Sequence, residues 1–249
     1  GDTFEIRTKT KPHATETLTI DAADTRRKAI HFKENSYGTT HTGLRNNSYA
    51  MDNPDPDWIS FSWWMKVHGQ DDTSDCIFQT QNASSETGLL LWHDDDDFEL
   101  NVHASNQNAS NQYTWRSSAT DPVSRWNHYL LVIKKSNMGV IPTMFKNGVR
   151  LPNTHYTDAS TAYSGTTLRD LQKITLGDRN AADQAHEMNG SMCDFVIWNM
   201  SASLEDAQIL YNSGSSYNLY SHPDVAKISD WWSLGDDVAP ASGSTLNSG

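Results

Sequence analysis

The feature of this sequence that most limits its fold is a recurrence of short segments rich in β-branched and aromatic residues. Clusters of Gly, Asn, Asp and Ser separate them. This pattern is typical of antiparallel sheets joined by turns rather than of strands alternating with helices. Several segments alternate apolar and polar residues, which predicts that one face of each strand packs on a core. The predicted strands cover residues 29–32, 59–67, 76–80, 88–92, 98–103, 113–117, 128–134, 141–145, 174–176, 192–198 and 228–234.

One segment departs from this pattern of strands and turns. Residues 203–211 begin with Ser203, a favourable N-cap residue, and place Leu204, Ala207 and Tyr211 at helical intervals. Two acids in the first turn and a glycine soon after the last turn are typical helix start and stop signals. We therefore predict one short surface helix in an otherwise all-β chain.

Local patterns predict further details. The Asn-Gly pair at 147–148 predicts a tight type I′ hairpin, because both central residues of that turn take positive φ. Strict alternation in the predicted strand 192–198 predicts that Cys193 faces the same way as Phe195. The adjacent Trp63 and Trp64 are expected to face opposite sides of their sheet for the same reason.

Composition and charge narrow the range of functions. The chain has 249 residues, with 19 Lys and Arg against 31 Asp and Glu, and a formal net charge of -12. Such a surface repels polyphosphates and anionic bilayers, so we expect no nucleic-acid partner. No apolar run reaches the ~18 residues of a membrane-spanning helix, so we expect no membrane insertion. The carboxylates suit calcium, which binds oxygen ligands, or they serve only solubility.

The interior of the sequence shows no shift in composition that would divide it. We predict a single domain over residues 1–249, with a core of about 24–236 and a linker-like tail at 237–249. The two cysteines, Cys76 and Cys193, are too few for a disulfide scaffold or a Cys-based zinc site. We expect buried free thiols, with one bridge possible if their two strands adjoin.

Six ordered motifs carry a family resemblance. They are an opening strand, a Trp-Trp strand, a Trp-Asn-His strand, the Asn-Gly hairpin, a Leu-Gly turn and a closing strand, at residues 28–32, 59–66, 126–132, 144–149, 174–177 and 189–199. Together they resemble the laminin-G-like domains of the concanavalin-A-like lectin and glucanase superfamily, over roughly residues 24–236. The resemblance implies an all-β jelly-roll sandwich of two antiparallel sheets with one short helix. Residues 229–236 look like a strand common in phage and other viral structural proteins.

The resemblance also implies a kind of function. This fold hosts lectins, adhesion modules, enzymes and virion proteins, so the fold by itself does not define an activity. The implied reading is a non-catalytic module that binds carbohydrate or another surface. Its partners would be a glycan or cell-surface polysaccharide, or other structural subunits of an assembly. The implied location is extracellular or on a virion surface.

A structural calcium ion is a further implication of the resemblance. In related sandwiches the Asp of the closing-strand motif holds calcium together with backbone carbonyls from the first strand and turn. That makes Asp194 the expected ligand, with carbonyls from residues 33–35. The alternative is that Asp194 hydrogen-bonds a neighbouring loop, since a buried carboxylate must be neutralised, hydrogen-bonded or metal-bound. The acid-rich loop at 177–183 makes Asp178 a second candidate, although Arg179 within it disfavours a dense cation site.

Candidate sugar-binding residues follow from the chemistry of saccharides. Aromatic rings stack on the apolar faces of sugars, and polar side chains on loops bind the hydroxyls. Two stretches supply both kinds of group. The residues expected to bind a glycan are Trp92, His93, Tyr113, Trp115 and Arg116.

An enzymatic alternative rests on an acidic run. Asp95, Asp97 and Glu99 are two residues apart and would share one face of a continuous strand, like the Glu-x-Asp-x-Glu arrangement of bacterial β-glucanases. Here the first position is Asp, and the run lies between two apolar strands where a hairpin turn belongs. We therefore expect a solvated acidic turn. A polysaccharide hydrolase or lyase is the alternative.

Overall fold

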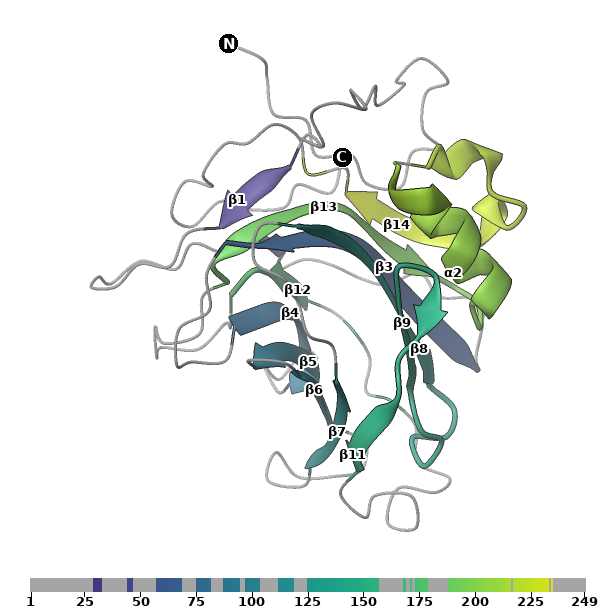
Figure 1. Cartoon of the computed structure of the whole chain (residues 1–249). Coiled ribbons are helices and arrows are strands. Elements are labelled where there is room, and N and C mark those ends of the chain that lie inside the picture. Colours follow the sequence, from purple (N-terminus) through teal and green to yellow (C-terminus); the bar gives the residue numbers. More distant parts are fainter. Residues whose placement is uncertain are drawn as a thin grey trace.

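The computed structural model describes residues 29–32, 44–46, 57–68, 75–81, 87–94, 97–103, 112–118, 125–156, 168, 171, 173–178, 188–215, 217–232 and 234. These residues form two antiparallel sheets that pack face to face, with a short helix outside one of them (Figure 1). We name each sheet after one of its strands, the β13 sheet and the β6 sheet. The predicted sandwich of two antiparallel sheets with one short helix is confirmed.

Each sheet has seven strands within the described residues. The β13 sheet has the order β1 (Ile30–Phe32), β13 (Gly190–Trp198), β3 (Trp58–Val67), β8 (Trp126–Lys134), β9 (Thr143–Lys146) and β10 (Val149–Arg150), and β14 (Ile228–Trp232) also pairs with β13. The β6 sheet has the order β11 (Asn153–Tyr156), β7 (Gln112–Ser118), β6 (Asp97–His103), β5 (Thr87–Asp94), β4 (Asp75–Gln81), β12 (Lys173–Leu176) and β2 (Leu44–Asn46).

Aromatic rings connect the two sheets through the core. Phe61 on β3 stacks on Phe78 on β4, with ring centroids 4.9 Å apart. Phe98 on β6 meets Tyr129 on β8 at the same centroid distance of 4.9 Å. All four side chains are completely buried. Each pair joins one sheet to the other, so these large apolar rings hold the sandwich closed.

A third layer covers the outer face of the β13 sheet (Figure 1). It contains α2 (Leu204–Tyr211) and the short 3₁₀ turns η1 (Asn212–Gly214), η2 (Leu219–Ser221) and η3 (Val225–Lys227). Ala207 and Leu210 of α2 are buried against strand residues that include Trp198. The predicted helix is confirmed, and its capping box is complete. Asp206 N–H donates to Ser203 Oγ at 3.2 Å, and Ser203 N–H donates to Asp206 Oδ2 at 2.6 Å.

The adjacent tryptophans alternate as predicted. Trp63 lies in the core between the sheets, and Trp64 faces outward. Trp64 is nevertheless only 3% exposed. Its ring centroid lies 6.0 Å from that of Tyr211, at the end of α2. The outer layer therefore covers the outward-facing tryptophan of this pair.

The predicted alternation is wrong at Cys193. A β-bulge interrupts the pairing of β13 with β3 between Cys193 and Val196, and Asp194 takes a positive φ of 50°. Phe195 points into the core as expected, but Cys193 packs on the opposite face beside Trp64. A bulge inserts one extra residue, so residues before and after it no longer share the expected faces.

Other local predictions have clear outcomes. Asn147 and Gly148 take φ values of 51° and 74°, which confirms the predicted hairpin between β9 and β10. Both cysteines are buried and free, and they lie in different sheets. The short strand β2 was not predicted, and the prediction gave no bounds for β10 and β11. No helix in the described part of the chain is long and apolar enough to cross a membrane.

Candidate functional site

Three neighbouring strands of the β6 sheet bring an aromatic, an acidic and a basic residue into one row. Trp92 on β5 pairs with Glu99 on β6, which pairs with Arg116 on β7. Their neighbours in sequence belong to the core between the sheets. Alternation therefore places this row on the outer face of the β6 sheet, away from the β13 sheet.

The charged groups of this row contact one another directly. Arg116 Nη2 forms an ion pair with Glu99 Oε2. Asn101, two residues further along β6, donates from Nδ2 to Glu99 Oε1 at 3.1 Å. The Arg116 side chain is 39% exposed and that of Glu99 is 17% exposed. Arg116 Nε is buried and has no acceptor among the residues that the structure describes. We call Glu99, Asn101 and Arg116 the outer-face polar cluster. Arg116 and, in part, Glu99 are accessible from outside, whereas Asn101 is 6% exposed and holds Glu99 from below.

Trp92 supports this cluster from one side. Its side chain packs with Leu90 and Cys76 in a small buried group, and 7% of its surface is exposed. Leu90 in turn pairs with Asn101 on β6 and with Gln79 on β4. Trp92 is therefore held in place by its packing with Leu90 and Cys76 and presents little ring surface to a ligand. The polar side chains, not a bare aromatic ring, are the accessible groups of this row.

The structure corrects two of the predicted sugar-binding residues. Trp115 is completely buried in the core, and His93 is 2% exposed. The His93 ring lies edge-on to Phe98, with centroids 4.9 Å apart. Each is adjacent in sequence to Trp92 or Arg116, and adjacent residues of a strand face opposite sides of the sheet. Neither side chain can reach a ligand on the outer face. Tyr113 lies on β7, and its side chain is outside the described part.

The acidic run lies at a hairpin between β5 and β6, and of its three candidate carboxylates the structure describes that of Glu99. β5 ends at Asp94, β6 begins at Asp97, and these two residues pair with each other. Asp95 and the side chain of Asp97 lie outside the described part of the chain. Glu99 continues along β6, and both its carboxylate oxygens are engaged, by Arg116 and by Asn101. The hairpin predicted for this stretch is confirmed.

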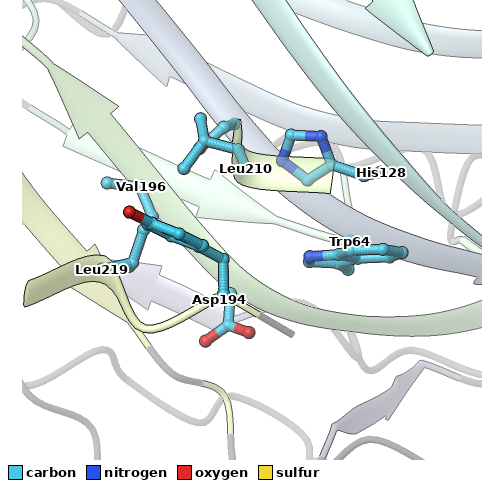
Figure 2. A pocket seen from close by; sticks show the side chains of 8 residues that line it. Trp64, His128, Asp194, Val196, Leu210 and Leu219 are labelled. Atoms are coloured by element: carbon cyan, nitrogen blue, oxygen red, sulfur yellow. The ribbon is translucent and has the colours of Figure 1, made fainter. Parts of the chain in front are cut away.

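Asp194 lies at a break in the outer face of the β13 sheet. β1 and β14 pair with the same strand, β13, at residues 190–192 and 195–198, and Asp194 falls between the two stretches. Its Oδ1 accepts a hydrogen bond from the indole Nε1–H of Trp231 at 3.3 Å. The side chain also borders a small pocket beneath α2, together with Trp64, His128 and Leu210 (Figure 2). Asp194 therefore accepts a hydrogen bond, as in the alternative to calcium, but the donor lies on strand β14 rather than on a loop.

Asp194 and Asp178 belong to different sheets. Asp178 follows β12, two residues after Leu176, and is 1% exposed. Neither aspartate belongs to a group of three or more His, Cys, Asp or Glu ligands within the described residues. A calcium ion at either one would need backbone carbonyls or amide oxygens, which this cation accepts. Residues 33–35, the expected carbonyl donors for Asp194, lie outside the described residues.

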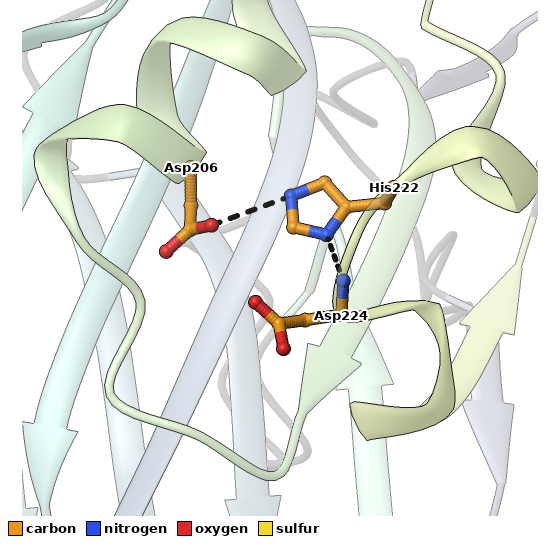
Figure 3. Close-up of side chains that lie close together, drawn as sticks. All are labelled: Asp206, His222 and Asp224. Atoms are coloured by element: carbon orange, nitrogen blue, oxygen red, sulfur yellow. Dashed lines mark hydrogen bonds and ion pairs between the residues drawn. The ribbon is translucent and has the colours of Figure 1, made fainter.

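Asp206, His222 and Asp224 form a group that no sequence motif predicts (Figure 3). Their potential ligand atoms all lie within 4.8 Å of one another. His222 Nε2 lies 3.5 Å from Asp206 Oδ1, and His222 Nδ1 accepts the backbone N–H of Asp224 at 3.1 Å. A neutral imidazole that accepts at Nδ1 carries its proton on Nε2, which then faces Asp206. Nε2 makes no hydrogen bond within the described residues, so its 3.5 Å approach to Asp206 Oδ1 is a longer electrostatic contact, which we call the His222 tie. A metal would need the Nε2 lone pair, so these residues fit this tie better than a metal site.

Burial determines the charge state of this imidazole. The His222 ring packs against Trp198, with ring centroids 4.8 Å apart, and is 2% exposed. Burial lowers the pKa of His222, and the negative charges of Asp206 and Asp224 partly oppose this shift. The net effect favours the neutral form. This tie connects α2 to the turn before η3 and stabilises the layer over the β13 sheet.

Comparison with known proteins defines the class. The fold is a jelly-roll sandwich, and a laminin G family model described as the concanavalin A-like lectin/glucanases superfamily matches residues 21–209. The chain belongs to the concanavalin A-like lectin/glucanases superfamily. A search of curated proteins gave no match.

Solved structures share this fold at low sequence identity. The native heptameric SAP-like pentraxin of Limulus polyphemus is 13% identical with a TM-score of 0.57, and the alignment covers 88% of this chain and 100% of the pentraxin chain. The receptor binding domain of a botulinum neurotoxin C/D mosaic serotype is 15% identical with a TM-score of 0.50. That alignment covers 75% of this chain and 46% of the toxin chain, so the present chain spans about half of the toxin domain. These likenesses concern the fold alone.

Proposed function

We propose that this chain is a non-catalytic carbohydrate-binding module whose ligand site is the outer-face polar cluster of the β6 sheet. The observation that carries this proposal is the contact of Arg116 and Asn101 with the two oxygens of Glu99. Saccharide hydroxyls both donate and accept hydrogen bonds, so they match a cluster that offers fixed donors and acceptors. The family description, which includes lectins, supports the same class of ligand.

The outer faces of the two sheets differ in a way that favours this location. On the β13 sheet, α2 and the turns that follow it cover the outward-facing apolar residues. On the β6 sheet, the Arg116 side chain remains 39% exposed. Mixed polar groups on a rigid sheet face hold their positions without a ligand, which reduces the entropy lost on binding.

The same family description includes glucanases, so hydrolysis of a polysaccharide is the alternative activity. Glycoside cleavage commonly requires two carboxyl groups about 5–10 Å apart on either side of the scissile bond. Of Asp95, Asp97 and Glu99, the structure places the side chain of Glu99, whose oxygens already contact Arg116 and Asn101. These contacts favour a positioning role for Glu99 over acid catalysis.

Binding and turnover can be measured on the same purified chain. We expect retention on a glycan array and no release of reducing ends from a polysaccharide panel. Arg116→Ala should lose binding, whereas Arg150→Ala should retain it, because Arg150 is an exposed arginine on β10 of the other sheet. Cleavage that Glu99→Gln abolishes would overturn the proposal in favour of a hydrolase or lyase. Equal binding by the two arginine variants would move the site elsewhere.

A structural calcium ion at Asp194 is a second proposal. It is supported by the position of Asp194 two residues beyond Met192, the partner of Ile30 at the start of β1, and by the oxygen chemistry of the acidic chain. Phe32, which precedes the expected carbonyl donors 33–35, pairs with Gly190 at the other end of β1. Millimolar calcium should raise the melting temperature, because a ligand that binds the native state stabilises it by mass action. Asp194→Ala should remove the gain, and Glu205→Gln, which changes an exposed acid on α2, should keep it. A melting curve that calcium leaves unchanged would exclude the ion.

A further inference from the structure

We infer that the outer-face polar cluster selects neutral saccharides over saccharides that carry carboxylate or sulfate groups. This inference rests on the proposed function and adds the charge class of its ligand. Three independent features of the cluster and of the chain lead to it.

The first feature is that the accessible cation already has its counter-ion. Arg116 Nη2 is paired with Glu99 Oε2, so an anion that approaches the guanidinium also approaches a carboxylate. The attraction of one charge and the repulsion of the other largely cancel at the distance of a bound ligand. A neutral hydroxyl experiences no such repulsion.

The second feature is the geometry left on the guanidinium. Arginine binds a carboxylate or sulfate most tightly through two parallel N–H groups, and the side-on pair consists of Nε and Nη2. Nη2 is bound to Glu99, and Nε is buried. The side-on fork is therefore closed to an incoming anion. The remaining end-on pair, Nη1 with Nη2, shares Nη2 with Glu99, so an anion bound there would lie beside that carboxylate, whereas a hydroxyl oxygen would not be repelled.

The third feature is the complementarity of the cluster to hydroxyl groups. Arg116 only donates hydrogen bonds, ionised Glu99 only accepts them, and the Asn101 amide does both. Neighbouring hydroxyls of one sugar ring can donate to Glu99 and accept from Arg116 together. The formal net charge of -12 acts in the same direction, because it repels polyanionic chains before contact.

The test compares neutral and acidic sugars of matched shape. Calorimetry would use gluco-, manno- and galacto-configured neutral tetrasaccharides and their uronic-acid counterparts. We expect at least one neutral probe to bind about tenfold more tightly than its acidic counterpart, a difference that corresponds to the closed arginine fork. In Glu99→Gln the negative charge beside Arg116 is removed, so neutral binding should weaken and acidic binding should strengthen, and the ratio of neutral to acidic affinity should fall at least about tenfold.

Glu205→Gln is the matched control. It removes the same charge from an exposed position on α2 and should keep the wild-type ratio. Salt provides a measurement that needs no variant, because neutral-sugar affinity should stay within about twofold between low and high ionic strength.

The failures of the two proposals can be distinguished. A wild-type chain that prefers the uronic acids, or a Glu99→Gln variant with an unchanged ratio, overturns the neutral-ligand inference and leaves carbohydrate binding in place. A wild-type chain that binds neither series nor any glycan on an array overturns the proposed function itself, and this inference with it.

Discussion

Gly177 lies where the end of β12 meets β1 of the other sheet, and its substitution gives a sharp test of the fold. It follows β12 of the β6 sheet and has a positive φ of 72°. A Cβ atom added there would lie 2.3 Å from Cδ1 and 2.4 Å from Cε1 of Phe32 on β1. Phe32 is completely buried, so its ring has no open space into which it could move. Gly177→Ala should therefore destabilise the domain through two separate effects.

The magnitude of each effect can be worked out from the geometry. A non-glycine residue in the left-handed region costs about 1–2 kcal/mol. Forcing an additional methyl group into a packed core costs about 1–3 kcal/mol more. Together they predict a loss of about 2–5 kcal/mol for Gly177→Ala, which is a large part of the stability of an ordinary domain.

Gly214→Ala is the matched control for this prediction. Gly214 also has a positive φ, of 91°, but the atom nearest to an added Cβ is Tyr211 Oη at 3.6 Å. This variant should therefore show the conformational cost alone, about 1–2 kcal/mol. The difference between the two variants measures the clash with Phe32.

Urea unfolding followed by tryptophan fluorescence measures both variants. The midpoint should fall further for Gly177→Ala than for Gly214→Ala, at a similar slope, because the surface exposed on unfolding does not change. Adding Phe32→Leu to Gly177→Ala should recover part of the loss, since the two residues are in contact. If Gly177→Ala costs no more than Gly214→Ala, β1 does not pack on the end of β12, and the closure of the sandwich described above is wrong.

Three further predictions concern the β13 sheet and its outer layer. Burial lowers the pKa of His222 in the folded chain below its ordinary value of 6.5, so the unfolded chain binds the proton more readily. The free energy of unfolding should therefore fall as the pH drops through about 6.5 toward the folded pKa. His222→Gln should flatten that part of a pH series of melting temperatures, and a variant that follows the wild-type profile would rule His222 out as the source. Ser203→Ala removes the cap of α2 and should cost about 1 kcal/mol in urea unfolding, so a midpoint that does not move would show that the cap is unimportant. Ser62→Ala removes the acceptor of the buried Trp198 indole N–H, which lies 2.9 Å from Ser62 Oγ. This variant should lower the free energy of unfolding by about 1–3 kcal/mol, whereas Ser229→Ala, near the sheet edge, should lower it less.

Local sequence rules gave correct results where a feature depends on adjacent residues. The N-cap at Ser203, the positive φ values at 147–148 and the opposite faces of Trp63 and Trp64 are all as predicted. Each depends on backbone geometry within a few residues. The same rules named Trp92 and Arg116, which lie in one row, but they also named His93 and Trp115 on the opposite face, because composition was considered without the alternation of the strand.

The features that the sequence did not predict involve residues far apart in the chain. The short strands β2, β10 and β11 have weak patterns of their own, and pairing with longer neighbours defines them. The bulge at Asp194 occurs between the stretches of β13 that pair with β1 and with β14, and such an insertion leaves no mark in an alternating pattern. The tie between His222 and Asp206 joins residues that no motif connects.

The sequence by itself determined that this chain forms two antiparallel sheets with one short helix, because hydrophobic periodicity and turn chemistry act over a few residues. The tertiary structure decided which side chains of those strands meet. Glu99 and Arg116 are 17 positions apart, and only the register of β6 on β7 places them in contact. Register depends on the packing of the whole sheet against its partner, so the candidate site could be located from the sequence but not assembled from it.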